Sequence, residues 1–597
     1  MKKQCVRIGG ATGYWGDADM AVPQFLADGD VDFIVFDYLA EITMSILARA
    51  RAADPAMGYA TDFVTSVIKP HLTAIASSNI RLISNAGGVN PESCATVVRE
   101  LIAEAGLNLS VAVVTGDDLM PQLSALSALN PKEMFSGDAL PPLEHVASAN
   151  AYLGAFPIAR ALDDGADIVI TGRCVDSAVT LGACIHSFGW TSQDLDHLAT
   201  GSLAGHIIEC GAQATGGNYT DWQELAESLH NIGYPIAQIT DSGDLTICKP
   251  RGTGGAVTVG TVGEQILYEI GDPAAYYLPD VICDFSHVTV TQEGTDRVEV
   301  RGAKGTGIPD HYKASITWAD GWRAGTTFFY VGSRAAEKAR IFANVALERS
   351  RSKLLALGVE DFQEVSIEVV GDESHYGSAA RYVRSREVTV KVACRHAERS
   401  AAALLLRELT GAALGAPAGL FMFAGSRPKP SPVIRLFSTL VPKDFTRVDV
   451  LGENSRWHYS PEQMRNIVPV ISNPLIPEGD SADELVSVPL ERLAWARSGD
   501  KGNKANIGVI ARKADYLPWI ARTLTVDSVN ERFAHFLASP AIDRYYMPGL
   551  HALNFVLHEA LGGGGVASLR NDPQAKCYAQ LLLDVSIPIP KKLIGDD

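Results

Sequence analysis

Short apolar runs alternate with helical patterns through residues 1–272. The expected strands lie at residues 6–8, 33–36, 80–84, 111–115 and 168–171, and the expected helices at 18–26, 40–53, 91–105 and 153–163. Apolar strands that alternate with amphipathic helices are typical of a parallel sheet covered on both faces. The pattern therefore predicts an α/β fold with a doubly wound parallel sheet, in which ligands bind beyond the carboxyl ends of the strands.

Each of these five expected strands runs into a polar or glycine-bearing segment at its carboxyl end. The segments begin at Gly9, Asp37, Asn85, Gly116 and Gly172. Because the carboxyl ends of parallel strands lie at one edge of a sheet, we expect these exits to converge on one crevice. The expected substrate-binding positions in the first and third exits are Gly10, Gly13, Asn85, Gly87, Gly88 and Asn90.

The first exit has the spacing Gly10-x-x-Gly13-x-x-Gly16, which fits the fingerprint of extended short-chain dehydrogenases. Two observations argue against a bound dinucleotide. Asp17 and Asp19 would repel a pyrophosphate, and no tyrosine stands four residues before a lysine, so the Tyr-x-x-x-Lys pair of such enzymes is absent. An NAD(P)-dependent oxidoreductase is therefore the second alternative, and the other interpretation of the motif is a tight turn.

Two strand exits carry pairs of charged side chains that could do chemistry. Asp37 and Glu41 would share one helix face if residues 37–50 are helical, and paired carboxylates can act as general base and acid or bind a hard cation. Arg173 and Asp176 follow the fifth strand, where the guanidinium could hold a carboxylate or phosphate. The alternatives are a helix start for the first pair and a structural ion pair for the second.

The densest polar run, at residues 205–218, contains His206, Glu209 and Cys210 at a spacing that could place them on one helix face. Such a group could set a nucleophile beside a base or supply metal ligands. Neither His-Glu-x-x-His nor His-x-His occurs, so we expect no metal and take His206 and Glu209 as acid/base candidates. A buried, hydrogen-bonded histidine is the alternative.

Two further loops could contact a phosphate. Gly254 and Gly255 lie in a run that could form a backbone nest for an anion, and a turn is the equal alternative. The most basic loop of the chain carries Arg497, Lys501 and Lys504, which could neutralise a phosphate-bearing ligand such as coenzyme A. The alternative for that loop is a solvated hairpin.

Four consecutive glycines at residues 562–565 exceed what a helix C-cap needs. They favour a close approach of the backbone to a ligand or to a partner subunit.

Beyond residue 272 the pattern changes to short strands and two long helices, which predicts an α+β part of the same N-terminal region at 273–451. Residues 452–486 contain several prolines and predict a linker. The segment 487–597 predicts a small α+β domain. Its expected strands lie at residues 486–497, 507–511 and 577–587, and its expected helices at 529–537 and 549–561.

Charge and composition exclude several classes of protein. The 51 Lys and Arg against 69 Asp and Glu give a net charge of −18, which argues against a broad surface for nucleic acid or an anionic membrane. No apolar run approaches the ~18 residues of a membrane span, and no apolar stretch of a secretory signal follows Met1. Nine cysteines without a Cys-x-x-Cys pair predict a reduced, cytoplasmic protein.

Distinct long motifs are spread along nearly the whole chain, at residues 9–17, 36–41, 84–91, 165–178, 205–218, 253–279, 497–508 and 548–570. Together they resemble the acyclic terpene utilisation protein A (AtuA) family. The resemblance implies a large N-terminal family domain, a small C-terminal ferredoxin-like domain, and a role in the catabolism of citronellol- and geraniol-type compounds as coenzyme A thioesters. It implies no settled reaction, so no catalytic residue is transferred.

Breakdown of a branched acyl-CoA needs a hydration and then cleavage of a tertiary 3-hydroxyacyl-CoA, and both steps need acid/base groups and an electrophile. We therefore expect a hydro-lyase or carbon–carbon lyase that uses no cofactor beyond the coenzyme A of its substrate. A non-catalytic scaffold of the same pathway is the first alternative, and we expect a homo-oligomer. The expected catalytic residues are Asp37, Glu41, Asp176, His206 and Glu209, with Arg173 holding an anionic group.

Overall fold

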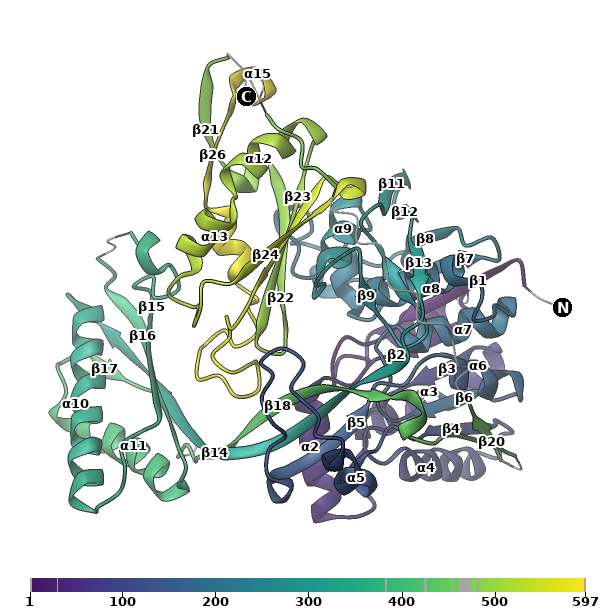
Figure 1. Ribbon diagram of the computed structural model, residues 1–597, viewed down its shortest axis with the longest axis horizontal. Helices are drawn as coiled ribbons and strands as arrows, with labels where there is room; N and C mark the ends of the chain where they lie inside the picture. Colours follow the sequence, from purple (N-terminus) through teal and green to yellow (C-terminus); the bar gives the residue numbers. More distant parts are fainter. Residues whose placement is uncertain are drawn as a thin grey trace.

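A mixed sheet forms the core of the main body of the molecule, on the right in Figure 1, in the computed structural model. The structure describes residues 3–28, 30–381, 384–423, 427–453, 455–460, 474–479 and 483–594. In this part of the chain the sheet has eleven strands, in the order β11-β12-β8-β7-β1-β2-β3-β6-β4-β19-β20. Its middle five strands are parallel: β1 (Cys5–Gly10), β2 (Phe33–Phe36), β3 (Arg81–Ser84), β6 (Ile168–Thr171) and β4 (Val111–Thr115).

Antiparallel strands extend this parallel centre on both sides. On one side lie β7 (Ile236–Thr240), β8 (Leu245–Cys248), β12 (Arg297–Arg301) and β11 (Thr289–Gly294), and on the other β19 (Val448–Leu451) and β20 (Arg456–Tyr459). The sheet thus takes strands from both sides of residue 272. Strand β20 falls within the segment expected to be a linker, whose residues 461–473 and 480–482 lie outside the described residues.

Helices cover both faces of the parallel centre, as the sequence predicts. The apolar run of strand β2 is continuous because both of its faces are buried. Phe33 and Val35 belong to the core on one face, and Ile34 and Phe36 to the core on the other. One face packs against α1 (Ala21–Asp28), α2 (Glu41–Ala53), α3 (Lys69–Ser78) and α4 (Pro91–Glu104), and the other against α6 (Phe156–Asp163), α7 (Ala178–Phe188) and α8 (Leu195–Ile208).

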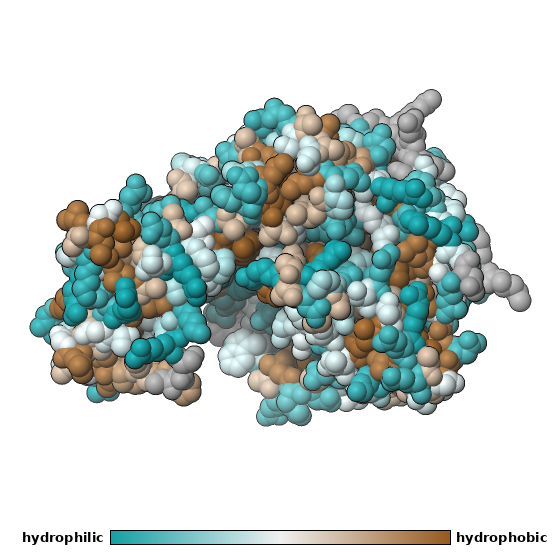
Figure 2. Space-filling view, turned by 90° about the horizontal axis from the view of Figure 1, so that it is seen from below, coloured by the Kyte–Doolittle hydropathy of each residue, from teal (hydrophilic) through white to brown (hydrophobic). Residues whose placement is uncertain are grey.

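A long strand carries an outer lobe away from the central sheet (Figure 1). Strand β14 (His311–Val331) pairs near its start with β5 (Val146–Ala151) and β18 (Ser431–Pro442), and near its end with β16 (Glu387–His396). The lobe adds β15 (Glu364–Val370), β17 (Leu420–Phe421), α10 (Ala335–Ala356) and α11 (Arg399–Ala412), and has a hydrophobic core of its own. Seen from below, the molecule is hollowed between this lobe and the main body (Figure 2).

Several shorter elements complete this part of the molecule. They comprise the π-helical turn Phe63–Ile68, α5 (Leu123–Ala128), α9 (Val259–Leu267) and the three-stranded sheet of β9 (Tyr276–Tyr277), β10 (Ile282–Asp284) and β13 (Lys304–Gly307). No helix in the described ranges is long and apolar enough to cross a membrane.

The C-terminal domain has a four-stranded antiparallel sheet with the order β22-β23-β25-β24 and its own core. The strands are β22 (Ala494–Lys501), β23 (Lys504–Ala511), β25 (Ala552–Leu557) and β24 (Ile542–Met547), and a separate pair is formed by β21 (Leu485–Pro489) and β26 (Ser586–Pro590). The helices are α12 (Leu517–Thr523), α13 (Val526–Phe533), α14 (Tyr578–Leu583) and α15 (Lys591–Ile594).

Two of the expected elements in this domain are wrong. The helix expected at 549–561 is strand β25, all of whose residues are buried, and most of the strand expected at 577–587 is helix α14. A short apolar run has no periodicity that separates a central strand from a buried helix, and here tertiary packing decides the structure.

Candidate active site

A cleft with a volume of about 1830 Å³ opens beyond the carboxyl ends of the parallel strands. Its walls come from the exits of β1, β2 and β6, from the paired strands β14 and β18, and from the C-terminal domain. The exits of β3 and β4 lie just behind this wall, where they hold residues that line it. The strand exits therefore converge on one cleft, as predicted.

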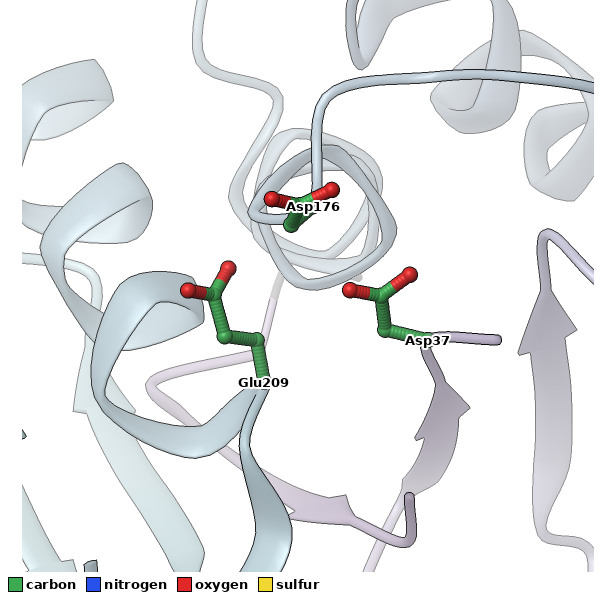
Figure 3. A group of neighbouring side chains, drawn as sticks. All are labelled: Asp37, Asp176 and Glu209. Carbon is green, nitrogen blue, oxygen red and sulfur yellow. The ribbon is translucent and has the colours of Figure 1, made fainter. Parts of the chain in front are cut away.

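Three carboxylates that line this cleft lie close together (Figure 3). Asp37 follows β2, Asp176 precedes α7, and Glu209 follows the last turn of α8. Figure 3 shows the three side chains near one another, and one oxygen of each lies within 4.8 Å of one oxygen of the others. Residues far apart in the sequence thus form one acidic group.

The environment of this group favours protonation of two of its members. Burial raises the pKa of Asp37 well above its usual range, and the charge of Asp176 adds to this effect while Arg173 and Asn85 oppose it. Burial likewise raises the pKa of Glu209, partly offset by His206. A carboxyl group whose pKa is raised can donate a proton as well as accept one, which is the property a general acid or base needs.

Asn85 positions Asp37 and is not itself open to substrate. Its side chain is fully buried, its amide donates to Asp37 Oδ1, and its oxygen accepts a 2.7 Å hydrogen bond from the backbone N–H of Tyr38. The hydroxyl of Thr12 also donates to the backbone oxygen of Asp37, at 2.7 Å. The exits of β1 and β3 therefore fix the loop that carries Asp37.

Arg173 is buried, with 4% of its surface exposed, and it forms the ion pair that the sequence analysis gave as the alternative. Its Nη1 donates to Asp176 Oδ1 at 2.7 Å, and its guanidinium stacks on the ring of Tyr152 at 4.0 Å. The backbone N–H of Arg173 donates to Asp117, a buried acid behind the cleft wall. The pair of Arg173 and Asp176 lines the cleft, so its structural contacts and a role toward substrate are compatible.

Glu41 does not share a helix face with Asp37, because α2 begins at Glu41 itself. The hydroxyl of Tyr152 donates to Glu41 Oε1 at 2.8 Å, and Lys313 Nζ lies 3.6 Å from the same oxygen. Burial would raise the pKa of Glu41, but Lys313, Arg173 and the Tyr152 hydroxyl lower it to about 2. Glu41 is therefore a fixed negative charge and is not suited to exchange protons.

His206 supports Glu209 from behind. It is 2% exposed, its Nε2 lies 3.1 Å from the backbone oxygen of Ile266, and its Nδ1 lies 3.4 Å from Glu209 Oε1. Cys210 does line the cleft, but burial raises the pKa of its thiol, which disfavours a thiolate nucleophile. The structure therefore keeps Glu209 as the acid/base candidate of this run and gives His206 a positioning role.

The glycines of the first exit pack against α8 and Cys210. A Cβ on Gly10 would clash with the backbone oxygen of Ile208, and one on Gly13 would lie 2.9 Å from the backbone of Cys210. Gly13 N–H donates to Asp17 at 2.9 Å, as in a tight turn. Gly13 lines the cleft, and Gly10 does not.

Several residues expected to bind substrate lie outside the lining of the cleft. Gly88 has a positive φ of 55°, and a Cβ there would clash with Leu47. Asn90 donates to the backbone oxygens of Pro55 and Met57. The predicted residues that the structure uses for packing or turns are Gly10, Gly87, Gly88, Asn90, Gly254 and Gly255.

Arg497 was expected to meet a phosphate, and this expectation is wrong. Its side chain is 4% exposed, its Nη2 pairs with Glu264 Oε2 at 2.9 Å, and its Nη1 donates to Gln213 and Gln265. Arg497 therefore fastens the C-terminal domain to α9. The other two basic residues of that loop, Lys501 and Lys504, do line the cleft.

Comparison with known protein families assigns the chain to one of them. The family model described as "Acyclic terpene utilisation family protein AtuA" matches residues 6–451. The chain belongs to the AtuA family. A second model, the AtuA ferredoxin-like domain, matches residues 488–588. The resemblance stated from the sequence is thereby confirmed, and neither the curated proteins nor the solved structures gave a match.

The AtuA region and the AtuA ferredoxin-like domain both contribute to the cleft. Tyr152, Lys313 and Glu269 also line the cleft. They were not predicted as site residues because no local motif marks them. Tyr152 and Lys313 come from segments more than 150 residues apart, and the alignment of β5 on β14 brings them together. Asp500 also lines the cleft, and burial together with the charge of Glu269 raises its pKa to about 7.

The three carboxylates also have the chemistry of a site for Mg²⁺ or Ca²⁺, which prefer carboxylate oxygens. Two cations already face this group, however. Arg173 donates to Asp176, and Lys501 lies close enough to lower the pKa of Glu209. That no metal is needed stays a prediction.

Proposed function

We propose that the chain is a hydro-lyase or carbon–carbon lyase that acts on a branched acyl-CoA thioester in acyclic terpene utilisation. The observation that carries this proposal is the group formed by Asp37, Asp176 and Glu209, in which burial and mutual repulsion raise the pKa of Asp37 and Glu209. Membership of the AtuA family supports the pathway, and the site chemistry supports the class of reaction.

Both reactions need the same groups. In hydration, a base takes a proton from water, the oxygen bonds to C3, and an acid delivers a proton to C2. In cleavage, a base takes the proton of the C3 hydroxyl, the bond between C2 and C3 breaks, and an acid protonates C2. Asp37 and Glu209 supply the base and the acid, and Arg173 orients Asp176 beside them.

The cleft also suits the coenzyme A part of the substrate. Basic side chains also line it, and they can meet the negative charges of a phosphate or a carboxylate. They are Lys313, Arg323, Arg435, Lys504 and Arg570. Lys313 already pairs with Glu41 and Arg435 with Asp320. Arg323 and Arg570 donate to backbone oxygens and Lys504 lies over a ring, so these three are the cations that can meet an anionic substrate in a protein of net charge −18.

The test is mass spectrometry of the purified protein with a panel of branched enoyl- and 3-hydroxyacyl-CoA esters, without nicotinamide. A gain or loss of water, or release of an acyl-CoA fragment, supports the proposal. Asp37→Asn and Glu209→Gln should each lower kcat by about 10²- to 10⁴-fold. Glu299→Gln, on β12 outside the cleft, is the matched control. No conversion together with binding to another enzyme of the pathway favours the scaffold, and conversion only with nicotinamide favours an oxidoreductase.

We expect turnover to survive dialysis against EDTA, because Arg173 and Lys501 already supply positive charge beside the carboxylates. The measurement is the rate before and after dialysis, with and without added Mg²⁺. Loss of activity that Mg²⁺ restores would show instead that Asp37, Asp176 and Glu209 hold a divalent ion.

A further inference from the structure

The C-terminal domain inserts the tip of one hairpin into the cleft. Strand β22 ends at Lys501, strand β23 begins at Lys504, and Gly502 and Asn503 form the turn between them. All four residues line the cleft, together with Asp500. The domain that family comparison separates from the AtuA region therefore supplies part of its proposed active site.

Lys501 has a charge without a fixed partner. Among the described residues no hydrogen bond or ion pair of its ammonium is found within 4.0 Å. The other lysines of the cleft differ: Lys313 pairs with Glu41, and Lys576 contacts Glu269. Lys504 lies over the ring of Phe135 at 4.0 Å. Lys501 is partly buried, and an ammonium that lines a cleft without a protein partner is a hydrogen-bond donor available to a ligand.

The groups that face Lys501 keep it charged. Burial pulls the pKa of Lys501 down, but Tyr276, Glu269, Asp176 and Glu209 outweigh this effect and hold the pKa well above its usual value. Two of these groups, Asp176 and Glu209, belong to the acidic group of Figure 3. Lys501 thus lies at the reacting end of the cleft. Because Lys501 lies beside the carboxyl groups proposed to transfer protons, we expect it to meet the reacting part of the substrate and not a phosphate.

The hairpin that carries Lys501 is fixed at its base. Arg497 of β22 pairs with Glu264 of α9 at 2.9 Å, and both side chains are almost fully buried. Asn506 of β23 donates to the backbone oxygen of Leu267 at 2.7 Å, and a Cβ on Gly508 would lie 2.5 Å from Leu267. These contacts leave the hairpin little freedom to turn against the AtuA region.

The tip is fixed by the glycine loop at residues 562–565. Gly563 N–H donates to Asn503 Oδ1 at 2.9 Å, and Ala560 N–H donates to the backbone oxygen of Asn503 at 3.0 Å. A Cβ on Gly564 would lie 3.1 Å from the backbone oxygen of Gly502. The tetraglycine therefore lets its backbone approach the turn that orients Lys501.

We propose that Lys501 is the electrophile of this active site. Its ammonium donates a hydrogen bond to the thioester carbonyl oxygen and stabilises the negative charge that develops there as the enolate forms, without itself transferring a proton. The inference rests on the proposed function, and it makes the ferredoxin-like domain a catalytic part of the molecule.

Lys501→Met tests the inference, with the exposed Lys513→Met of the same domain as the matched control. We expect Lys501→Met to lower kcat by about 10²- to 10³-fold with a much smaller change in KM, because the interaction strengthens only as the enolate forms. Lys513→Met should retain wild-type kcat. Circular dichroism and thermal unfolding establish that both variants fold.

A second variant separates chemistry from structure. Lys501→Cys should lose activity and regain much of it after alkylation with 2-bromoethylamine, which rebuilds an ammonium at the same reach. Wild-type protein alkylated in the same way controls for modification of Cys210, which also lines the cleft. Full kcat in folded Lys501→Met, or no recovery of the alkylated Cys variant where the alkylated wild type stays active, would overturn the role of Lys501 while leaving the proposed function intact. Failure of the wild-type protein to convert any ester would overturn both.

Discussion

Three carboxyl groups of the cleft have different properties because their neighbours differ. Burial and mutual repulsion raise the pKa of Asp37 and Glu209, whereas Lys313 and Arg173 lower that of Glu41 to about 2. The residue type predicted from the sequence was thus enough to find candidates but not to assign roles. The roles depend on Tyr152, Lys313 and other groups that reach the cleft through long-range strand pairing.

Asp117 gives a prediction about stability at the scale of one residue. It is 3% exposed, and burial raises its pKa to about 7, although Asn150 and the backbone of Arg173 donate to it. A raised carboxyl pKa means that the folded state binds the proton more tightly than the unfolded state. The resulting stability is present below about pH 4 and is lost as the pH rises to about 7.

The free energy of unfolding of the wild type should therefore fall relative to Asp117→Asn between pH 4 and pH 7, by up to about 4 kcal/mol. Urea unfolding of both proteins across this range measures the difference. Parallel pH profiles for the two proteins would show that Asp117 does not change its ionisation on folding.

At the scale of elements, the parallel strands were predictable because burial on both faces gives each a continuous apolar run between turn residues. β2 and β4 match their expected ranges. The same property explains the two wrong predictions in the C-terminal domain. Strand β25 and helix α14 are both short and apolar, so their sequences do not distinguish a strand from a helix. Sequence pattern alone could not show that glycines such as Gly10 and Gly254 serve close packing, since that depends on which backbone lies opposite.

The contact between the exit of β1 and the end of α8 can be tested at Gly10. Alanine at this position would push its Cβ into the backbone oxygen of Ile208, which no side-chain rotation relieves. We expect Gly10→Ala to lower the free energy of unfolding by about 1–3 kcal/mol or more. Gly415→Ala, where a Cβ meets nothing within 4 Å, is the control and should change little. Equal stability of the two variants in urea would contradict the packing role.

At the scale of the whole molecule, the ferredoxin-like domain is joined to the AtuA region by buried polar contacts. Glu264 is fully buried and Arg497 is its ion-pair partner, so the pair links α9 to β22.

The homo-oligomer expected from the sequence stays a prediction. Light scattering of the purified protein measures its molar mass and so tests this prediction.

Arg497→Met should cost about 3–5 kcal/mol of stability, because it leaves a buried carboxylate without its partner. It should also lower turnover, since the hairpin that carries Lys501 loses its anchor. Adding Glu264→Leu should restore much of the stability, because the unpaired charge is gone. Denaturant unfolding and kcat of the single and double variants test this, and an unchanged single variant would contradict the docking role of the pair.

The central claim is that Asp37 and Glu209 transfer protons at the carbon next to a thioester carbonyl. It is tested most directly by running the hydration of a branched enoyl-CoA ester, or the cleavage of a branched 3-hydroxyacyl-CoA ester, in D₂O and measuring solvent deuterium at C2 of the product by mass spectrometry. We predict one deuterium at C2 in the product of the wild-type protein and loss of this incorporation in the variant with both Asp37→Asn and Glu209→Gln. Product without deuterium at C2, or undiminished incorporation by the double variant, would contradict it.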